Sequence, residues 1–497
     1  MTSNLTPWRT PSKVADHAKG ADSLPKLKTD NTGNTRTSVP WAVVIAAVAV
    51  LPGVFIPVPA MHDFFYLPKL LLLFGLELSL TVLLLLRQVR RRGCLFKTRN
   101  PLAAPLWAYL AVLAVSTWTS INPNRSLLGE PLRWEGLAAF LLYGGLVLLL
   151  PLAAQSEPVP AGVRGSGHSA TDRIAAQVEL LLRWGAFIMA LIVVYGVMQR
   201  YGLDPAPRDP VRAGAAWWST SAFTTLGNSN FLGSFAATYL LLTSVRYVCA
   251  PKDEPGWFWL GGAGFAYYGL LTALSRGAWL AAGAAFLGVM LLLAVLRLLP
   301  EGRRLLLLAG VLIALTLVWH FADPLASQRV TQLVQDTAHQ SGTVAQRLWI
   351  WHGTWRAVLA RPWLGWGLDS LIDVFPLYEP AGRAAVGLTG WLIDRAHNDF
   401  LQVAVSSGLL GLAAYLWLLW GAARAGWRML RHPGVAPLSR SLTLALLAAG
   451  MAHLLALATN ISTVSESPTF WGFLGLLAVL AASDLQDGGI SVDGIDG

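Results

Sequence analysis

The stretch RAHNDFLQVAVSSGLLGLAAYLWLLW, Arg395 to Trp420, decides the fold class of this protein. After its first residues it is apolar over about the 20 residues that an α-helix needs to cross a bilayer. Three polar residues, His397, Asn398 and Asp399, stand at the entrance of this run. A titratable histidine at the head of a membrane span suggests a function beyond spanning.

Apolar runs of this length recur along the chain. Of the 497 residues, 55% are hydrophobic and only 13% are charged, about half the charged fraction of an average soluble protein. We therefore expect an all-α integral membrane protein with about twelve transmembrane helices. The expected spans are residues 39–60, 67–86, 101–119, 136–153, 177–199, 229–248, 256–274, 278–297, 305–322, 398–421, 440–459 and 468–483.

Basic residues predict the orientation of these spans. Loops such as RQVRRRGCLFKTR and RLLPEGRR are rich in Arg and Lys, and the positive-inside rule places such loops in the cytoplasm. Both termini then lie in the cytoplasm, as a disordered tail over residues 1–38 and an acidic tail over 484–497. Cys94 and Cys249 fall on the same side and lack metal-type spacing. The basic residues behind the net charge of +10 cluster beside spans, which favours a topological role over nucleic-acid binding.

One connection on the opposite side of the membrane is long. Residues 323–397 separate two expected spans, whereas most helix connections take only a few residues. Within TVAQRLWIWHGTWRAVLARP, apolar residues recur at steps of three and four, which predicts one apolar helical face. This face comprises Leu348, Trp351, Trp355 and Val358. We expect transmembrane helices 1–9 over residues 39–322, a partly helical extracytoplasmic subdomain over 323–397, and helices 10–12 over 398–483.

His397 is the first candidate for chemistry. Its unperturbed pKa of about 6.5 lets a neutral imidazole accept a proton near neutral pH. A histidine that merely marks a helix start, with Asn398 or Asp399 as the N-cap, fits the sequence equally well.

Arginines on the same side of the membrane are the second group of candidates. Arg276, in LTALSRGAWLAAG, interrupts an apolar hairpin where topology needs no positive charge, and such a charge usually has an anionic partner. Arg347 lies in the long loop, where it could instead anchor an interfacial helix, and Arg212 is a weaker candidate. Guanidinium groups bind phosphate bidentately and keep their charge, so together they suggest an anionic ligand such as a lipid pyrophosphate.

Acidic residues are scarce, which bears on metal chemistry. No DxD pair or His/Asp/Glu cluster has the spacing of a metal site, so we expect neither a metal nor another cofactor. Glu77 is the clearest acid within a span and fits a structural or a proton-path role equally. Glu466 lies at the mouth of the last span. Outer tryptophans such as Trp355 could stack on sugar rings, although an interfacial belt explains most of the 22 tryptophans.

Four segments together resemble the O-antigen ligase and O-antigen polymerase superfamily. They are LTALSRGAWLA, TTLGNSNFLGSFAATYLLL, RLWIWHGTWRAVLARPWLGWGLDSL and HNDFLQVAVSSGLLGL, and the resemblance covers roughly residues 180–480. It implies an all-helical membrane glycosyltransferase with a glycan on undecaprenyl pyrophosphate as its donor. It also implies a reaction without a metal on the outer face of the bacterial inner membrane.

The resemblance also implies roles for single residues. His397 matches the family's histidine after the long loop, Arg276 and Arg347 match its arginines, and Glu466 matches an acidic residue more loosely. As a hypothesis, His397 takes the proton of the acceptor hydroxyl while Arg276 and Arg347 neutralise the departing pyrophosphate. Substrate-binding roles are expected for Arg212, Asn398, Trp355 and Glu466. Asn228 and Asn230 fit the family's Gly-Asn-x-Asn pattern, for which we expect a structural role.

Two rival functions remain open from the sequence. A ligase passes a finished glycan to a lipid or protein, whereas a polymerase passes it to another lipid-linked glycan, and the resemblance covers both. A transporter is the second rival, since twelve spans are common in that class. Transporters usually place polar residues at the midplane of broken helices, whereas the candidates here gather at one face.

Overall fold

The computed structural model describes most of the chain. The described residues are 66–91, 100–131, 133–155, 170–203, 222–251, 254, 256–296, 302–323, 325, 328, 330–332, 335 and 342–486. The chain divides into two units, Met1–Val39 and Pro40–Gly497, and every described residue belongs to the second. The expected cytoplasmic tail 1–38 and the first expected span, 39–60, lie outside the described residues.

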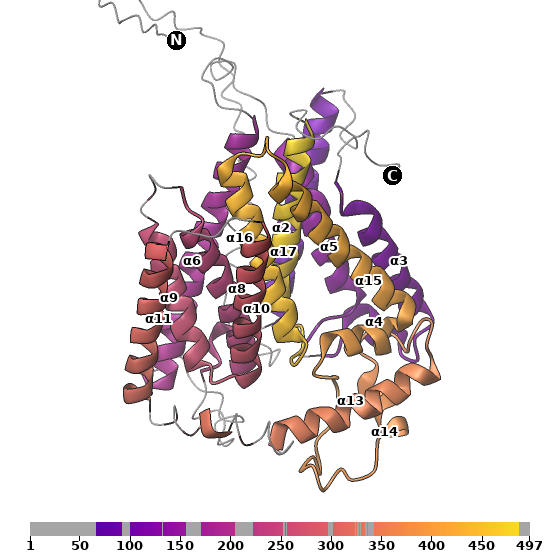
Figure 1. Cartoon of the computed structure of the whole chain (residues 1–497). Helices are drawn as coiled ribbons and strands as arrows, with labels where there is room; N and C mark the ends of the chain where they lie inside the picture. Colours follow the sequence, from indigo (N-terminus) through magenta and orange to yellow (C-terminus); the bar gives the residue numbers. More distant parts are fainter. Residues whose placement is uncertain are drawn as a thin grey trace, which may run out of the picture. The chain divides into compact units, whose positions relative to one another are not determined.

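The described residues form helices and loops without a strand, which confirms the all-α fold (Figure 1). Each expected span from 67–86 onward coincides with a helix. These helices are α2 (Leu67–Arg91), α3 (Ala103–Trp118), α5 (Leu137–Gln155), α6 (Ala170–Arg200), α8 (Ser229–Val248), α9 (Trp257–Thr272), α10 (Arg276–Val295), α11 (Gly302–Ala322), α15 (Asp399–Arg431), α16 (Pro437–Leu457) and α17 (Ser467–Gln486). Within the described residues, eight helices are long and apolar enough to cross a membrane. The protein is therefore a multi-pass membrane protein, and the total of twelve spans stays a prediction.

Helix α8 lies at the centre of the packing. Its residues from Phe231 to Val248 are all buried, and it packs against α9, α10 and α16. Small residues on α8, such as Gly233 and Ala237, let neighbouring helices approach closely, which is how helices associate in lipid. By contrast α11 is only 11% buried over its apolar window and exposes large apolar side chains such as Ile313. Lipid-facing helices need only be apolar, whereas α8 must fit its neighbours.

Helix α15 is interrupted at Gly408, whose φ of 70° and ψ of −174° are not helical. A Cβ at this position would lie 2.1 Å from the Trp363 carbonyl oxygen, so the position requires glycine. The loop before α14 pairs with the broken backbone. Its hydrogen bonds are Trp366 N to Val405 O (2.9 Å), Gly367 N to Ser406 O (2.9 Å) and Leu409 N to Pro362 O (2.6 Å). These bonds satisfy backbone groups that a break leaves open at membrane depth.

The long connection before α15 contains two described helices, α13 (Gly342–Ala360) and α14 (Leu371–Tyr378). Together with the short helix α4 (Pro123–Leu128) they lie at one end of the bundle, here called the α13 end (Figure 1). The side of α13 that packs inside the protein is not the apolar face given by the spacing. Its buried side comprises Trp349, Ile350, Gly353, Thr354, Ala357 and Val358, whereas Leu348 and Trp355 are 42% and 46% exposed. Apolar residues occur on all sides of α13, so their spacing in the sequence could not identify the side that packs inside the protein.

Glu77 lies on α2, where it is buried against α5. A Cβ added at Gly145 would lie 2.3 Å from a Glu77 carboxylate oxygen, so glycine makes the room for this acid. The structural and the proton-path roles of Glu77 both stay predictions.

Candidate functional site

His397 lies directly before α15, where two local bonds fix the chain. Asn398 is the N-cap, because its side-chain oxygen accepts a hydrogen bond from Leu401 N (3.1 Å). Ala396 N donates to Gln402 Oε1 (2.9 Å). Between these anchors His397 has a φ of 51°, in the left-handed region that few residues other than glycine occupy. The polar entrance of α15 therefore caps the helix and also turns His397 out of the helical path.

The charge state of His397 is set by its surroundings. Burial lowers its pKa to about 4, and the positive charges of Arg347, Arg133 and Arg395 lower that pKa further, while Asp394 raises it. The imidazole is therefore neutral at physiological pH, so a ring nitrogen has a lone pair to accept a proton. The neutral form is the protonation state that a general base requires.

Arg276 and Arg347 lie close enough to interact electrostatically. Arg276 is the first residue of α10, and it donates to Gln332 O (3.1 Å) and to Thr343 Oγ1 at the start of α13 (2.7 Å). Arg347 lies one helical turn further along α13, and burial together with the charge of Arg276 lowers its pKa. Within the described part of the chain no hydrogen bond or ion pair holds Arg347. Two neighbouring guanidinium groups have the chemistry to bind an anion, and an anion site here stays a prediction.

A narrow polar seam lies beside Arg347. A Cβ at Gly277 would lie 3.9 Å from Arg347 Nη1 and 2.5 Å from Thr459 Oγ1, so glycine lets the two helix ends approach. Arg347 and residues from α8, α10 and the loop after α16 line the seam. They include Asn230, Ser234, Ser275, Thr459 and Asn460.

Glu466 and the asparagine pair lie within or next to this seam. Glu466 is 1% exposed and accepts a short hydrogen bond from Ser234 Oγ, and burial raises its pKa. Asn228 caps α8 by accepting a hydrogen bond from Asn230 N (2.8 Å), as a structural role requires. Asn230 does more, because its side-chain oxygen also accepts from Ser275 Oγ (3.0 Å) next to Arg276.

The other residues expected to bind substrate are Arg212, Trp355 and Asn398. Arg212 lies outside the described residues. Trp355 is on α13, about 12 Å along the helix axis from Arg347, and its ring is half exposed. The oxygen of the Asn398 side chain is occupied by the cap. Direct substrate contacts by Arg212, Asn398, Trp355 and Glu466 stay predictions.

Sequence reasoning missed a buried ion network two residues before His397. Arg395 Nη2 contacts Asp369 Oδ1 at 2.8 Å and Glu135 Oε2 at 3.4 Å. These three side chains are at most 5% exposed. Charged residues are rare in this chain, so Glu135 at the head of a span was the available signal. Its partner, 260 positions away, could not be inferred from one sequence.

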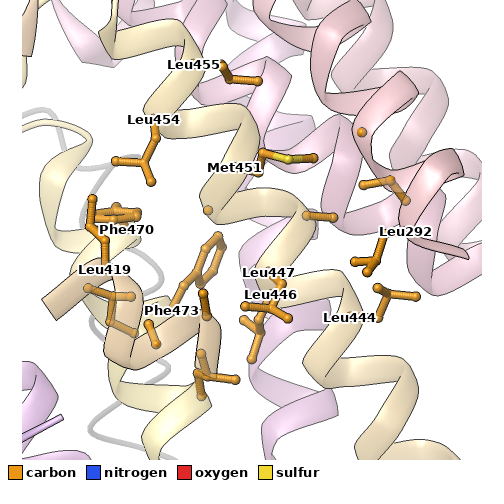
Figure 2. A pocket seen from close by; sticks show the side chains of 18 of the residues that line it. Leu292, Leu419, Leu444, Leu446, Leu447, Met451, Leu454, Leu455, Phe470 and Phe473 are labelled. Atoms are coloured by element: carbon orange, nitrogen blue, oxygen red, sulfur yellow. The ribbon is translucent and has the colours of Figure 1, made fainter. Parts of the chain in front are cut away.

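An apolar pocket of about 540 Å³ lies among α10, α15, α16 and α17. Figure 2 shows the side chains that face it, among them Leu419, Met451 and Phe473. Phe400 and Ala458 also line this pocket. Phe400 follows His397 by three positions, and Ala458 directly precedes Thr459. The pocket therefore extends to the level of the polar site.

Within the described residues no group of three or more His, Cys, Asp and Glu side chains could hold a metal ion. Positive charge near His397 comes from arginine side chains instead. Independence from a metal stays a prediction.

Comparison with known families gives one match. Residues 261–416 match the family model described as O-antigen ligase. This segment is similar to O-antigen ligases. It contains Arg276, Arg347 and His397 and ends before Glu466. The match confirms the resemblance to the O-antigen ligase and O-antigen polymerase superfamily. Comparison with curated proteins gave no match.

Proposed function

We propose that this protein is a membrane glycosyltransferase of the O-antigen ligase type. It moves a glycan from undecaprenyl pyrophosphate to an acceptor hydroxyl on the outer face of the inner membrane. The observation that carries the proposal is a neutral, half-buried His397 at the head of a membrane helix, beside Arg347, which in turn lies beside Arg276. The O-antigen ligase match over these residues supports the same activity.

The proposed reaction is a single displacement at the anomeric carbon. His397 accepts the proton of the acceptor hydroxyl while its oxygen forms the new glycosidic bond. The bond from the anomeric carbon to the pyrophosphate breaks, and Arg276 and Arg347 stabilise the charge that develops on the leaving group. Such fixed positive charge can supply the stabilisation that a divalent cation gives elsewhere, so the reaction needs no metal. The anomeric centre is inverted.

The apolar pocket supports a lipid-linked donor. Three of the helices that line it carry site residues at the α13 end: Arg276 begins α10, His397 precedes α15, and Thr459 follows α16. A donor with an anionic head and a hydrocarbon chain matches this order, with the pyrophosphate at the arginines and the first isoprene units in the pocket. Burying such a chain gains free energy in proportion to its apolar area.

The acceptor separates a ligase from a polymerase, and the family match is consistent with both. The subdomain around α13 and α14 is the part of the chain that would shape an acceptor site. Transport is not favoured, because in the described part of the chain the candidate residues His397, Arg276 and Arg347 gather at one end of the bundle.

Purified protein in a detergent or nanodisc, given a polyprenyl-pyrophosphate-linked oligosaccharide alone, tests the proposal on a gel that resolves glycan length. A ladder of multiples that His397→Ala abolishes indicates a polymerase. No ladder, but transfer after addition of an acceptor fraction from membranes, indicates a ligase. Absence of transfer in both settings would contradict the proposed activity. His352→Ala, an exposed histidine on α13, is the matched control.

A further inference from the structure

The Arg395 cluster, defined as Arg395, Glu135 and Asp369, joins three segments that are far apart in the sequence. Arg395 Nη2 contacts both acids. Glu135 also accepts hydrogen bonds from Ser462 Oγ and Ser467 Oγ (both 3.2 Å) in the connection from α16 to α17. The cluster thus ties the loop before α5, the subdomain before α15 and the loop after α16 together.

The backbone around this cluster is strained. Within the described chain, the residues other than glycine with positive φ are Trp134, Thr224, Leu274, Asp369 and His397. Three of these belong here, since Trp134 precedes Glu135, Asp369 is a member, and His397 follows Arg395 by two positions. Such conformations persist only where surrounding contacts enforce them, and they concentrate at functional sites.

We propose that Arg395 is a positioning residue that holds His397 in its left-handed conformation beside Arg347. The inference rests on the proposed function, because it assigns to the cluster the task of placing the base. Well-packed apolar residues in place of a whole buried ion network are often equally stable, although removal of one partner is costly. Because Arg395 Nη2 contacts one oxygen of Asp369 and one of Glu135, the network constrains the three segments to one arrangement.

The charge of Arg395 also acts on the imidazole. Charged groups that face His397 are Arg347 on α13, Arg133 before α5, and Asp394 and Arg395 beside it. Removing the positive charge of Arg395 raises the pKa of His397, because a neighbouring cation disfavours imidazolium. Removing the negative charge of Asp394 has the opposite sign. This pair of opposite shifts distinguishes an effect on His397 from general loss of structure.

The test compares Arg395→Gln, Arg395→Lys and the exposed control Arg356→Ala by donor kcat/KM against pH. We expect Arg395→Gln to lower kcat/KM about 100-fold, the cost of a small misplacement of a catalytic group, and to move the acidic limb of the profile to higher pH. Arg395→Lys keeps the charge, so its acidic limb should stay at the wild-type pH with part of the activity restored. Arg356→Ala should match wild type.

Asp369→Asn provides a second variant if Arg395→Gln does not fold, because asparagine has the same size and tolerates a left-handed backbone. It should lower kcat, with little change in the KM for the donor. Asp394→Asn should move the acidic limb to lower pH.

Wild-type kinetics in Arg395→Gln and Asp369→Asn would overturn the inference, as would a loss of rate with an unmoved acidic limb and no rescue by lysine. His397→Ala in the same assay separates the two proposals. If His397→Ala keeps full activity, the proposed function fails. If it is inactive while Arg395→Gln behaves like wild type, only the role of Arg395 fails.

Discussion

Buried ion networks occur at both ends of the α8 bundle, and they differ in what they hold. At the end opposite to the site, Arg246 contacts Glu179 (2.8 Å) and Glu254 (2.6 Å), and Arg183 contacts the same two acids at 2.8 and 2.9 Å. Arg246 lies about 24 Å along α8 from Asn230. Two cations and two anions balance there, and Trp259 lies under both guanidinium groups.

The charges of the Arg395 cluster do not balance, since it holds one cation and two acids. One arginine faces both Glu135 and Asp369, and burial raises the pKa of Glu135 to about 7 although Arg395 opposes this. Its segments hold residues other than glycine in the left-handed region, whereas the left-handed residue next to the Arg246 network in the described chain is a glycine, Gly256. A nearby cation, Arg347, has no partner in the described part of the chain. A charge-balanced network thus joins helices at one end, whereas the network with one arginine for two acids lies beside strained backbone and the candidate site.

Substitution of His397 by alanine should have the largest effect of any single change. Loss of a general base typically lowers the rate by about 10²–10⁴-fold. The measurement is glycan transfer by purified protein, normalised to folded protein by size-exclusion chromatography. Transfer at the wild-type rate would show that the α13 end is no more functional than the other end.

Arg347→Ala should have the second largest effect, because it removes one of the positive charges proposed to stabilise the leaving group. The expected loss in kcat is about 10²–10³-fold, as for loss of one donor to a developing anion. Arg424→Ala is the matched control, since this arginine contacts only the Trp420 ring among the contacts that the structure describes. Equal kinetics in both variants would contradict an anion site at Arg347.

Glu179→Gln tests the other network through stability. Removing one partner of a buried ion pair costs about 3–5 kcal/mol, so the melting temperature in detergent should fall markedly. The kcat of the protein that remains folded should be unchanged, because this network does not touch the site. A lower kcat with an unchanged melting temperature would show that this network serves the reaction and not stability.

Gly408→Ala should destabilise the break in α15 by about 1–3 kcal/mol, the cost of a residue held in a disfavoured backbone region. The added Cβ also meets the Trp363 carbonyl oxygen. Thermal unfolding measures the change, and Gly310→Ala on α11, where a Cβ meets nothing within 4 Å, is the control. The same melting temperature in both variants would show that the break is not enforced by the loop.

Hydropathy and charge sufficed to predict the helices, since membrane spans depend on local composition. His397, Arg276 and Arg347 were also accessible, because charge in an apolar context is conspicuous. The interruption of α15 at Gly408 could not be predicted from the sequence, because its conformation depends on a loop about 40 positions earlier. The Arg395 cluster depends on contacts across 260 positions. The packed side of α13 could not be predicted from spacing, because apolar side chains occur all around that helix.

The most direct test of the account is the pH dependence of kcat/KM for the wild-type protein. Since burial and three arginines lower the pKa of His397 to about 4, neutral imidazole persists in mild acid. We expect kcat/KM to be constant from about pH 7 to pH 5 and to fall in an acidic limb with its midpoint near the pKa of about 4. The residual activity of His397→Ala should lack this limb. A midpoint near the pH of about 6.5 typical of exposed histidine, or a limb that survives in His397→Ala, would contradict the account.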